Sequence, residues 1–248
     1  MKIFTTLVTI LLFGLSSLAL ADDPVPTAQQ LIERIDNLYR LNSSHATMTM
    51  DIQTPEWQRS MTMEIWSKDM DYTLVRILTP KKDTGITTLK RENEMWNYFP
   101  KIRKVIKVPP SMMMGSWMGS DFTNDDLVRE VSLEEDYQVT LDSSQPQYLL
   151  TLIPKEQTVT VWGRIDIYVD KTQLLPTRED YYDEDGTKMR EMTFSDVKDF
   201  DGRLLPAVME LKPLNKEGHL TRMTYDTLTF NESVDDSVFT LRNLKTIK

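Results

Sequence analysis

Two histidines, His45 and His219, and 38 Asp and Glu residues are the side chains that could do acid-base chemistry in this sequence. A Ser-His pair would have to use one of the two histidines, and neither lies beside a serine elbow of the G-x-S-x-G kind. Cysteine is absent, which excludes a thiol nucleophile. No two carboxylates can be assigned the roles of acid and base, so an envelope hydrolase is a weak alternative and we do not expect an enzyme.

Acidic residues cluster at two places where a cation could bind, namely Asp121 with Asn124, Asp125 and Asp126, and residues 183–186. A calcium loop of the EF-hand type needs oxygen ligands at alternate positions, a glycine at the sixth position and a glutamate at the twelfth. Neither stretch has this order, and we interpret the first as the start of a helix and the second as a hairpin turn. Phosphate-binding and dinucleotide-binding glycine motifs are also absent. The sequence therefore predicts neither a metal nor a cofactor.

Methionine is the unusual residue type, with 15 in the chain. It is unbranched and polarizable, which suits surfaces that accept ligands of varying shape. A packed core is the alternative for Met48, Met50, Met61 and Met63, because the inner wall of a curved sheet is a core when filled and a cavity when hollow. The candidate ligand-binding residues of a hydrophobic cavity and its lid are Met48, Met50, Ile52, Met61, Met63, Ile65, Trp66, Trp96, Met112, Met113, Met114, Trp117, Met118 and Phe122.

The first element expected to position these side chains is an amphipathic helix. Thr27 can cap its start, and we expect about four turns that end at residues 42–44. The apolar residues follow the i, i+3, i+4, i+7 spacing of one helix face, and they are Leu31, Ile32, Ile35, Leu38 and Tyr39.

From residue 47 onward the sequence alternates apolar and polar residues, as half-buried strands do. We expect about eleven strands in an antiparallel meander, because the connections are too short for helical crossovers. Hairpin turns are predicted at residues 183–186, 199–202 and 215–218. Basic residues at 101–104 and Lys107 are interpreted as the protected edge of a strand.

Residues 109–131, which we call the inserted segment, interrupt the alternating pattern. They contain two prolines, the run 112–114 of three methionines, Trp117 and Met118. We expect a mobile, apolar helical lid or plug, with a plain buried connection as the alternative.

The N-terminus has the pattern of a cleavable secretory signal. An apolar run from residue 3 to 15 follows Lys2, and Ala19-Leu20-Ala21 provides the small residues before a cleavage site. An uncleaved anchor helix is the alternative, but it needs about 20 apolar residues. We therefore expect a signal peptide at 1–21 and a soluble, single-domain mature chain at 22–248, which has no cysteine for a lipid anchor and resides in the periplasm. Cleavage changes the formal net charge from -9 to -10, so nucleic acid is not an expected partner.

Three strings of the sequence, residues 46–50 (ATMTM), 64–68 (EIWSK) and 93–100 (NEMWNYFP), resemble the LolA/LolB-like family of periplasmic lipoprotein carriers. A longer string, residues 116–127 (SWMGSDFTNDDL), resembles the branch of outer-membrane lipoprotein-sorting proteins. The resemblance covers most of the mature chain. It implies a mainly β (α+β) fold, an unclosed antiparallel β-barrel or half-pipe whose open side is plugged by helices over a hydrophobic cavity.

The resemblance also implies a carrier function. Such a protein takes lipid or lipoprotein acyl chains from an inner-membrane transporter of the ABC or RND/MMPL type and delivers them to an outer-membrane acceptor. The alternative is a non-enzymatic accessory subunit of an RND/MMPL-type exporter whose cavity is packed shut. One position departs from the family pattern, because Asp69 stands directly after Trp66-Ser67-Lys68, where the carriers have an arginine that ties the lid to the barrel.

Overall fold

The chain is described from a computed structural model that covers residues 25–39, 41–69, 71–128, 133–158, 160–231 and 233–245. The expected signal peptide, residues 1–21, lies outside these described residues. Within them, every helix is too short or too polar to span a membrane.

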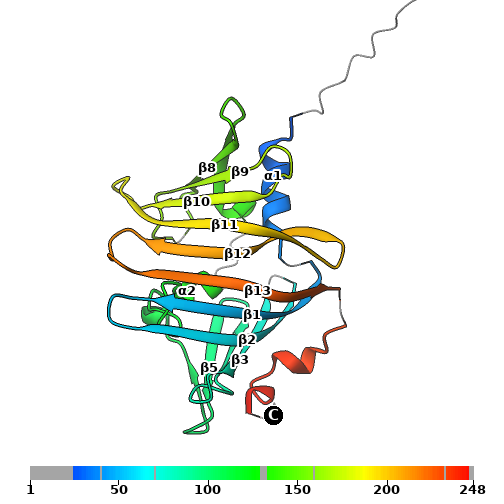
Figure 1. Cartoon of the computed structure of the whole chain (residues 1–248), viewed down its shortest axis with the longest axis vertical. Helices are drawn as coiled ribbons and strands as arrows, with labels where there is room; N and C mark the ends of the chain where they lie inside the picture. Colours follow the sequence, from blue (N-terminus) through cyan, green and yellow to red (C-terminus); the bar gives the residue numbers. More distant parts are fainter. Residues whose placement is uncertain are drawn as a thin grey trace, which may run out of the picture.

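Thirteen strands of the described chain form one antiparallel sheet in the order β6-β5-β4-β3-β2-β1-β13-β12-β11-β10-β9-β8-β7 (Figure 1). The sheet does not close, because β6 and β7 are its two edges, so the prediction of a mainly β, unclosed half-pipe is confirmed. There are two more strands than the eleven or so expected. The strands are β1 (Ser43–Gln53), β2 (Gln58–Lys68), β3 (Tyr72–Thr79), β4 (Thr87–Arg91), β5 (Glu94–Phe99), β6 (Lys104–Lys107), β7 (Tyr137–Asp142), β8 (Tyr148–Pro154), β9 (Arg164–Val169), β10 (Pro176–Tyr182), β11 (Lys188–Phe200), β12 (Arg203–Pro213) and β13 (Leu220–Phe230).

Tight turns join neighbouring strands throughout the sheet. The three predicted hairpin turns connect β10 to β11, β11 to β12 and β12 to β13, and their glycines Gly186, Gly202 and Gly218 have positive φ angles. The pairing of β1 with β13 is the exception, because it joins the first and last strands at the centre of the sheet. Edge strand β6 carries exposed Lys104 and Lys107, as predicted for a protected edge.

The N-terminal helix α1 (Ala28–Asp36) begins as predicted and ends earlier. Thr27 and Gln30 form a reciprocal capping box at its start. At its end, the backbone N–H of Leu38 donates to the carbonyl of Ile35, three residues back, and the side-chain amide of Asn37 donates to the carbonyl of Glu33, so the helical pattern ends before Leu38. Its buried side chains Leu31 and Ile32 pack in the same cluster as the buried residues of β8 and β9.

The two faces of the sheet differ in what covers them. The inner face carries Met48 of β1 and Met63 of β2 and is covered by the inserted segment, which lies behind β13 and β1 in the view of Figure 1. The outer face of β3 and β4 is covered by the C-terminal 3-10 helices η2 (Asp236–Phe239) and η3 (Asn243–Lys245). Phe239 and Leu244 of these helices are buried against the sheet.

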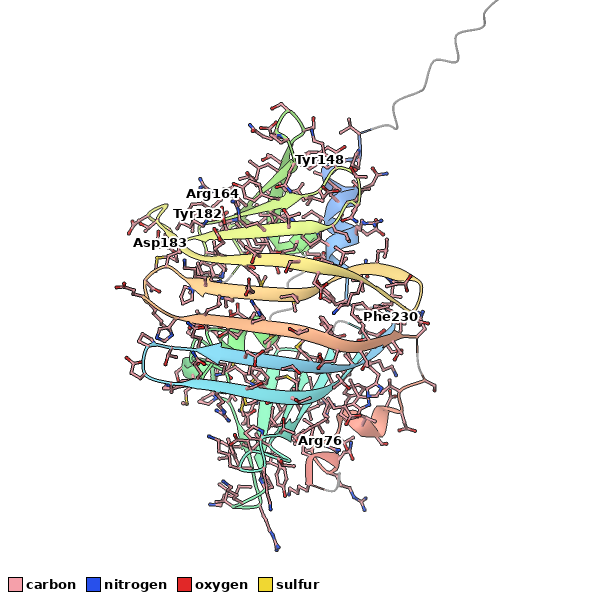
Figure 2. All side chains as sticks on the ribbon, viewed as in Figure 1. Arg76, Tyr148, Arg164, Tyr182, Asp183 and Phe230 are labelled. Carbon is pink, nitrogen blue, oxygen red and sulfur yellow. The ribbon has the colours of Figure 1, made fainter. Side chains whose placement is uncertain are left out.

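The outer face of β9 and β10 carries polar and aromatic side chains. The guanidinium of Arg164 lies 3.8 Å from the ring centre of Tyr182, and Figure 2 shows these two residues at the same end of their strands. Arg178 lies 4.0 Å from the ring centre of Tyr168. Such cation-π contacts keep this face both ordered and polar.

The inserted segment contains the 3-10 helix η1 (Pro110–Met112) and the short helix α2 (Asn124–Val128), and α3 (Leu133–Asp136) follows it. The expected helical lid is therefore not confirmed, since residues 113–123 consist mainly of turns and bends. Met118 and Gly119 have φ angles of 54° and 83°, which are incompatible with a continuous right-handed helix. Helix α2 starts at a reciprocal cap, in which the Thr123 hydroxyl and the Asp126 carboxylate each accept the other residue's backbone N–H.

Candidate functional site

Two adjoining cavities lie between the inner face and the inserted segment, with volumes of about 370 and 140 Å³. The two cavities share a wall, because five residues line both of them: Tyr39, Leu127, Met209, Met223 and Tyr225. The larger volume falls within the range of small-molecule sites, roughly 300–1,000 Å³. The arrangement is a mainly apolar space between the sheet and the elements that cover it, namely the inserted segment together with Ile35 of α1, Leu38, Tyr39 and Leu133 of α3.

The smaller cavity is formed by β1, β2, β4 and β5 together with the inserted segment. Four of the candidate residues line it, namely Met48, Met63, Ile65 and Trp117. Trp117 is 2% exposed, and its indole Nε1 donates a hydrogen bond of 3.2 Å to the hydroxyl of Thr88. This bond anchors the inserted segment to the sheet, because it satisfies the polar end of a buried aromatic side chain.

The other candidate residues lie in three different places. Phe122 lines the larger cavity. Met50, Ile52, Met61 and Met118 belong to the packed cluster beside the smaller cavity, where Met50 and Met61 are fully buried. The structure places the remaining candidates away from both cavities: Trp66 and Trp96 in the outer-face cluster, and Met112, Met113 and Met114 in the inserted segment, with Met112 60% and Met114 48% exposed.

A buried ion pair crosses the larger cavity. The Arg190 guanidinium on β11 donates two hydrogen bonds, of 2.9 and 2.8 Å, to the two carboxylate oxygens of Asp126 on α2. It also lies 4.5 Å from the ring centre of Trp162 and 4.2 Å from that of Tyr181. Burial by itself opposes the charge, but the bonds to Asp126 raise the pKa of Arg190 above its ordinary value.

The same ion pair sets the protonation of Asp126. Burial would raise the pKa of this carboxyl, but the hydrogen bonds and charge of Arg190, together with the hydrogen bonds from Thr123, hold it below its ordinary value. Asp126 is therefore charged at neutral pH. Because Asp126 belongs to α2 and Arg190 to the sheet, the pair ties the inserted segment to the wall of the barrel.

A second carboxyl group, that of Glu179 on β10, lies in the wall of the larger cavity. Burial raises the pKa of Glu179, and the Tyr181 hydroxyl donates a hydrogen bond of 2.5 Å to its Oε2. Two carboxyls that line the cavity, those of Asp126 on α2 and Glu179 on β10, thus interact with a single guanidinium. The polar side chains of the cavity are gathered around Arg190.

The position that departs from the carrier pattern makes different contacts. Asp69 occupies a turn with a φ angle of 50°, and Lys68 pairs with Asp236 in helix η2. This pair attaches the C-terminal helices to the outer face, whereas the Arg190–Asp126 ion pair is one of the contacts that connect the inserted segment to the barrel. Sequence reasoning missed this connection.

The two histidines have structural partners. His45 Nε2 lies 3.0 Å from a carboxylate oxygen of Glu64, and His219 Nδ1 lies 3.2 Å from one of Asp121. In the part of the chain that the structure describes, no three His, Asp or Glu side chains are grouped as metal ligands would be. The acidic stretches act as predicted in capping and turn formation, with Asp183 accepting the backbone N–H groups of residues 185 and 187.

Several known proteins share this architecture. A family model described as "Uncharacterized protein" matches residues 69–246, and no curated protein sequence matches the chain. A DUF1329 family protein from Desulfovibrio piger is 24% identical, with a TM-score of 0.78 over 90% of this chain and 100% of that one. A domain described as an outer membrane lipoprotein-sorting protein, from Vibrio parahaemolyticus, is 22% identical, with a TM-score of 0.73 over 88% and 96% of the two chains.

A LolA superfamily protein from Nitrosomonas europaea is 18% identical, with a TM-score of 0.71 over 88% of this chain and 99% of that one. At these identities the likeness shows a shared fold. The resemblance to the LolA/LolB-like family and its lipoprotein-sorting branch is confirmed at that level.

Proposed function

This chain belongs to the family whose model matches residues 69–246 and has the fold of the LolA superfamily, and from that premise we propose that it is a non-enzymatic carrier of lipid or lipoprotein acyl chains. We place it in the periplasm, where it would accept its cargo from an inner-membrane transporter of the ABC or RND/MMPL type. An outer-membrane acceptor would receive the cargo.

The observation that carries this proposal is the pair of adjoining cavities beneath the inserted segment. Their shared wall contains Leu127, Met209 and Met223, which offer apolar and adaptable side chains to a flexible chain. Each CH₂ group of an acyl chain that leaves water stabilises the complex by about 0.8 kcal/mol. A cavity of this kind binds through burial rather than through directed polar contacts.

The cover of the cavity suits a carrier. The Arg190–Asp126 pair and the hydrogen bond of Trp117 hold the inserted segment over the inner face. Arg59 also donates to the carbonyl of Met118, and Thr221 exchanges hydrogen bonds with Asp121. These contacts are made by side chains of the sheet, so a membrane partner could release them without disturbing the strand pairing. In the resulting cycle, the acyl chains would enter under the inserted segment, the segment would close over them during transit, and the acceptor would receive them.

Lipid extraction of the purified protein, followed by mass spectrometry, tests the proposal. We expect co-purified acyl lipids in the wild type and a large loss of them in Met209→Trp, which fills the shared wall, and in Met209→Asp, which charges it. Leu204→Asp is the matched control, because Leu204 is 56% exposed. A wild-type preparation that is free of lipid and also ignores a fluorescent fatty acid would contradict the carrier function.

The packed half of the inner wall favours a second candidate, a non-enzymatic accessory subunit of an RND/MMPL-type exporter. Met50 and Met61 are fully buried, and the cavity beside them is only about 140 Å³. Cross-linking in membranes should then recover a transporter at fixed stoichiometry. Under this candidate, Met209→Trp leaves cellular function intact while substitutions on an exposed surface abolish it.

A further inference from the structure

One stretch of this acidic chain carries only positive charges. The formal net charge of the whole sequence is -9, yet no Asp or Glu occurs from residue 95 to residue 120, where Lys101, Arg103, Lys104 and Lys107 all fall. Protection of a sheet edge accounts for Lys104 and Lys107, which lie on β6. It does not account for Lys101 and Arg103, because these two residues lie in the turn between β5 and β6.

This turn presents its central residues to solvent. The backbone N–H of Arg103 donates a hydrogen bond of 3.2 Å to the carbonyl of Pro100, which closes a four-residue turn. Lys101 and Ile102 are the two central residues of the turn, and Ile102 is 58% exposed. Ile106, on the edge strand that follows, is 46% exposed. Aliphatic and cationic side chains are therefore displayed together at this place.

A second basic loop lies against the same turn. Residues 80–86 connect β3 to β4, and a Cβ added to Gly85 of this loop would lie 3.5 Å from Cγ of Pro100. The loop carries exposed Lys81 and Lys82. Figure 1 shows the loops that follow β3 and β5 at the lower end of the molecule. We call this surface the basic tip, and its residues are Lys81, Lys82, Lys101, Ile102, Arg103 and Lys104.

We propose that the basic tip docks on a lipid bilayer that contains anionic phospholipids, with Ile102 entering the headgroup region. Charge complementarity favours this partner, because each Lys or Arg near an anionic bilayer adds to the attraction. Two carboxylates beside the tip have cations of their own, since Asp83 pairs with Arg59 and Glu94 with Lys107. Carboxylates more than about 10 Å away are largely screened at 0.1 M salt, so the net negative charge of the chain does not prevent docking.

The position of Ile102 among these cations favours a lipid surface over an acidic protein. A bilayer offers an apolar layer directly beneath its charged headgroups, so an aliphatic side chain can enter while the flanking cations stay at the level of the phosphates. The strands that lead into the tip, β4 and β5, also line the smaller cavity with Thr88 and Met95. Docking through the tip would therefore bring this cavity close to the bilayer.

A fluorescent label at the apex of the turn tests the proposal. Because the chain has no cysteine, Ile102→Cys provides a single site for an environment-sensitive fluorophore. We expect its emission to shift to shorter wavelength with vesicles of phosphatidylcholine mixed with phosphatidylglycerol, and not with vesicles of phosphatidylcholine alone. Leu204→Cys on β12 is the matched control, because Leu204 is 56% exposed, and its label should not respond to either kind of vesicle.

Charge variants test the electrostatic part by co-sedimentation with the mixed vesicles. The double variant Lys101→Gln, Arg103→Gln should bind at least about tenfold more weakly than the wild type, since each cation contributes about fivefold. The double variant Lys212→Gln, Lys216→Gln changes the net charge by the same amount at exposed positions of β12 and the turn after it, and should bind as the wild type does. Thermal unfolding shows that each variant is folded.

The outcomes separate docking from the carrier function. Absence of wild-type binding to the mixed vesicles would overturn the proposal and leave an acidic protein as the partner of the basic tip. An equal response of the Leu204→Cys label, or unchanged binding of Lys101→Gln, Arg103→Gln, would overturn it as well. Acyl lipids that co-purify with a protein that binds no vesicles would leave the carrier function standing without docking, and vesicle binding by a lipid-free protein that ignores fatty acids would do the reverse.

Discussion

The ion pair between Arg190 and Asp126 provides the most direct test of how the inserted segment is held. The change is Asp126→Asn, which keeps the size of the side chain and removes its charge. The side chains of Arg190 and Asp126 are 10% and 19% exposed, so the variant leaves a buried guanidinium without its main partner. Removal of one member of a buried pair costs about 3–5 kcal/mol.

The lower end of that range applies here, because the charge of Glu179 also interacts with Arg190 and remains in the variant. A loss of about 3 kcal/mol corresponds to a decrease of roughly 6–12 °C in the unfolding midpoint for a chain of this size. Urea unfolding of Asp126→Asn, Arg190→Met and the double variant gives the coupling energy of the pair. We expect the double variant to lose less stability than the sum of the single variants, by at least about 1.5 kcal/mol.

Hydrogen exchange locates the effect. The backbone amides of residues 113–128 should exchange faster in Asp126→Asn, because the inserted segment loses its tie to β11, while the amides of β1 and β2 should change less. Glu210→Gln is the control, since its partner Arg222 is exposed and such surface pairs contribute about 0–1 kcal/mol. A loss below about 1 kcal/mol in Asp126→Asn, or strictly additive single variants, would refute this account of the segment.

Four further predictions concern pH, burial and the backbone. The pKa of Asp126 is lower in the folded than in the unfolded chain, so its charge stabilises the fold fully above the unfolded value of about 4. This stabilisation is lost as pH falls through the folded value. The stability difference between wild type and Asp126→Asn should therefore shrink in acid. The pKa of Glu179 is raised instead, so the cost of its charge in the fold begins above the unfolded value of about 4.3 and is complete above the raised value. Unfolding midpoints across pH should therefore show that Glu179→Gln stabilises the fold increasingly as pH rises and has no such effect in acid. Trp117→Ala should cost about 3–5 kcal/mol in urea unfolding, whereas Met112→Ala, at an exposed site, should stay within about 0.5 kcal/mol. Gly163→Ala would place a Cβ 2.6 Å from a backbone oxygen of the β10–β11 turn, and a midpoint equal to that of the wild type would contradict the tight approach seen there.

The period-two pattern predicted the sheet because strand pairing and face assignment both depend on local alternation. The same pattern also predicts that Trp66 faces away from the cavities. Ile65 lines the smaller cavity, and the next residue along a strand points to the opposite face of the sheet. The family strings drew attention to Trp66 despite that pattern. Helix α1 was predicted too long because its hydrogen-bond pattern tightens at Leu38, whose N–H donates to Ile35, before its apolar pattern ends.

The polar end of the larger cavity could be predicted only in part. Arg190 alternates in phase with Met192 and Phe194 on β11, and all three line the larger cavity, which marks the arginine as an inward-facing charge. Its partner Asp126 is 64 residues away in the sequence and lies on another element. No local pattern identifies such a partner, because the pairing follows from the path of the inserted segment across the sheet.

The pairing of β1 with β13 has a consequence for the order in which the chain folds. Strands β1 to β6 and strands β7 to β13 each form a meander of neighbouring strands. Among the strands that the structure describes, β1–β13 is the one pairing that links the two halves, with paired residues such as Thr47 and Thr227 separated by 180 positions. Closing so long a loop slows folding, so the pairing of β1 with β13 should form late. A circular permutant that joins the ends of the chain and opens the inserted segment would make every pair in the sheet local, and it should therefore fold faster than the natural order of the same residues.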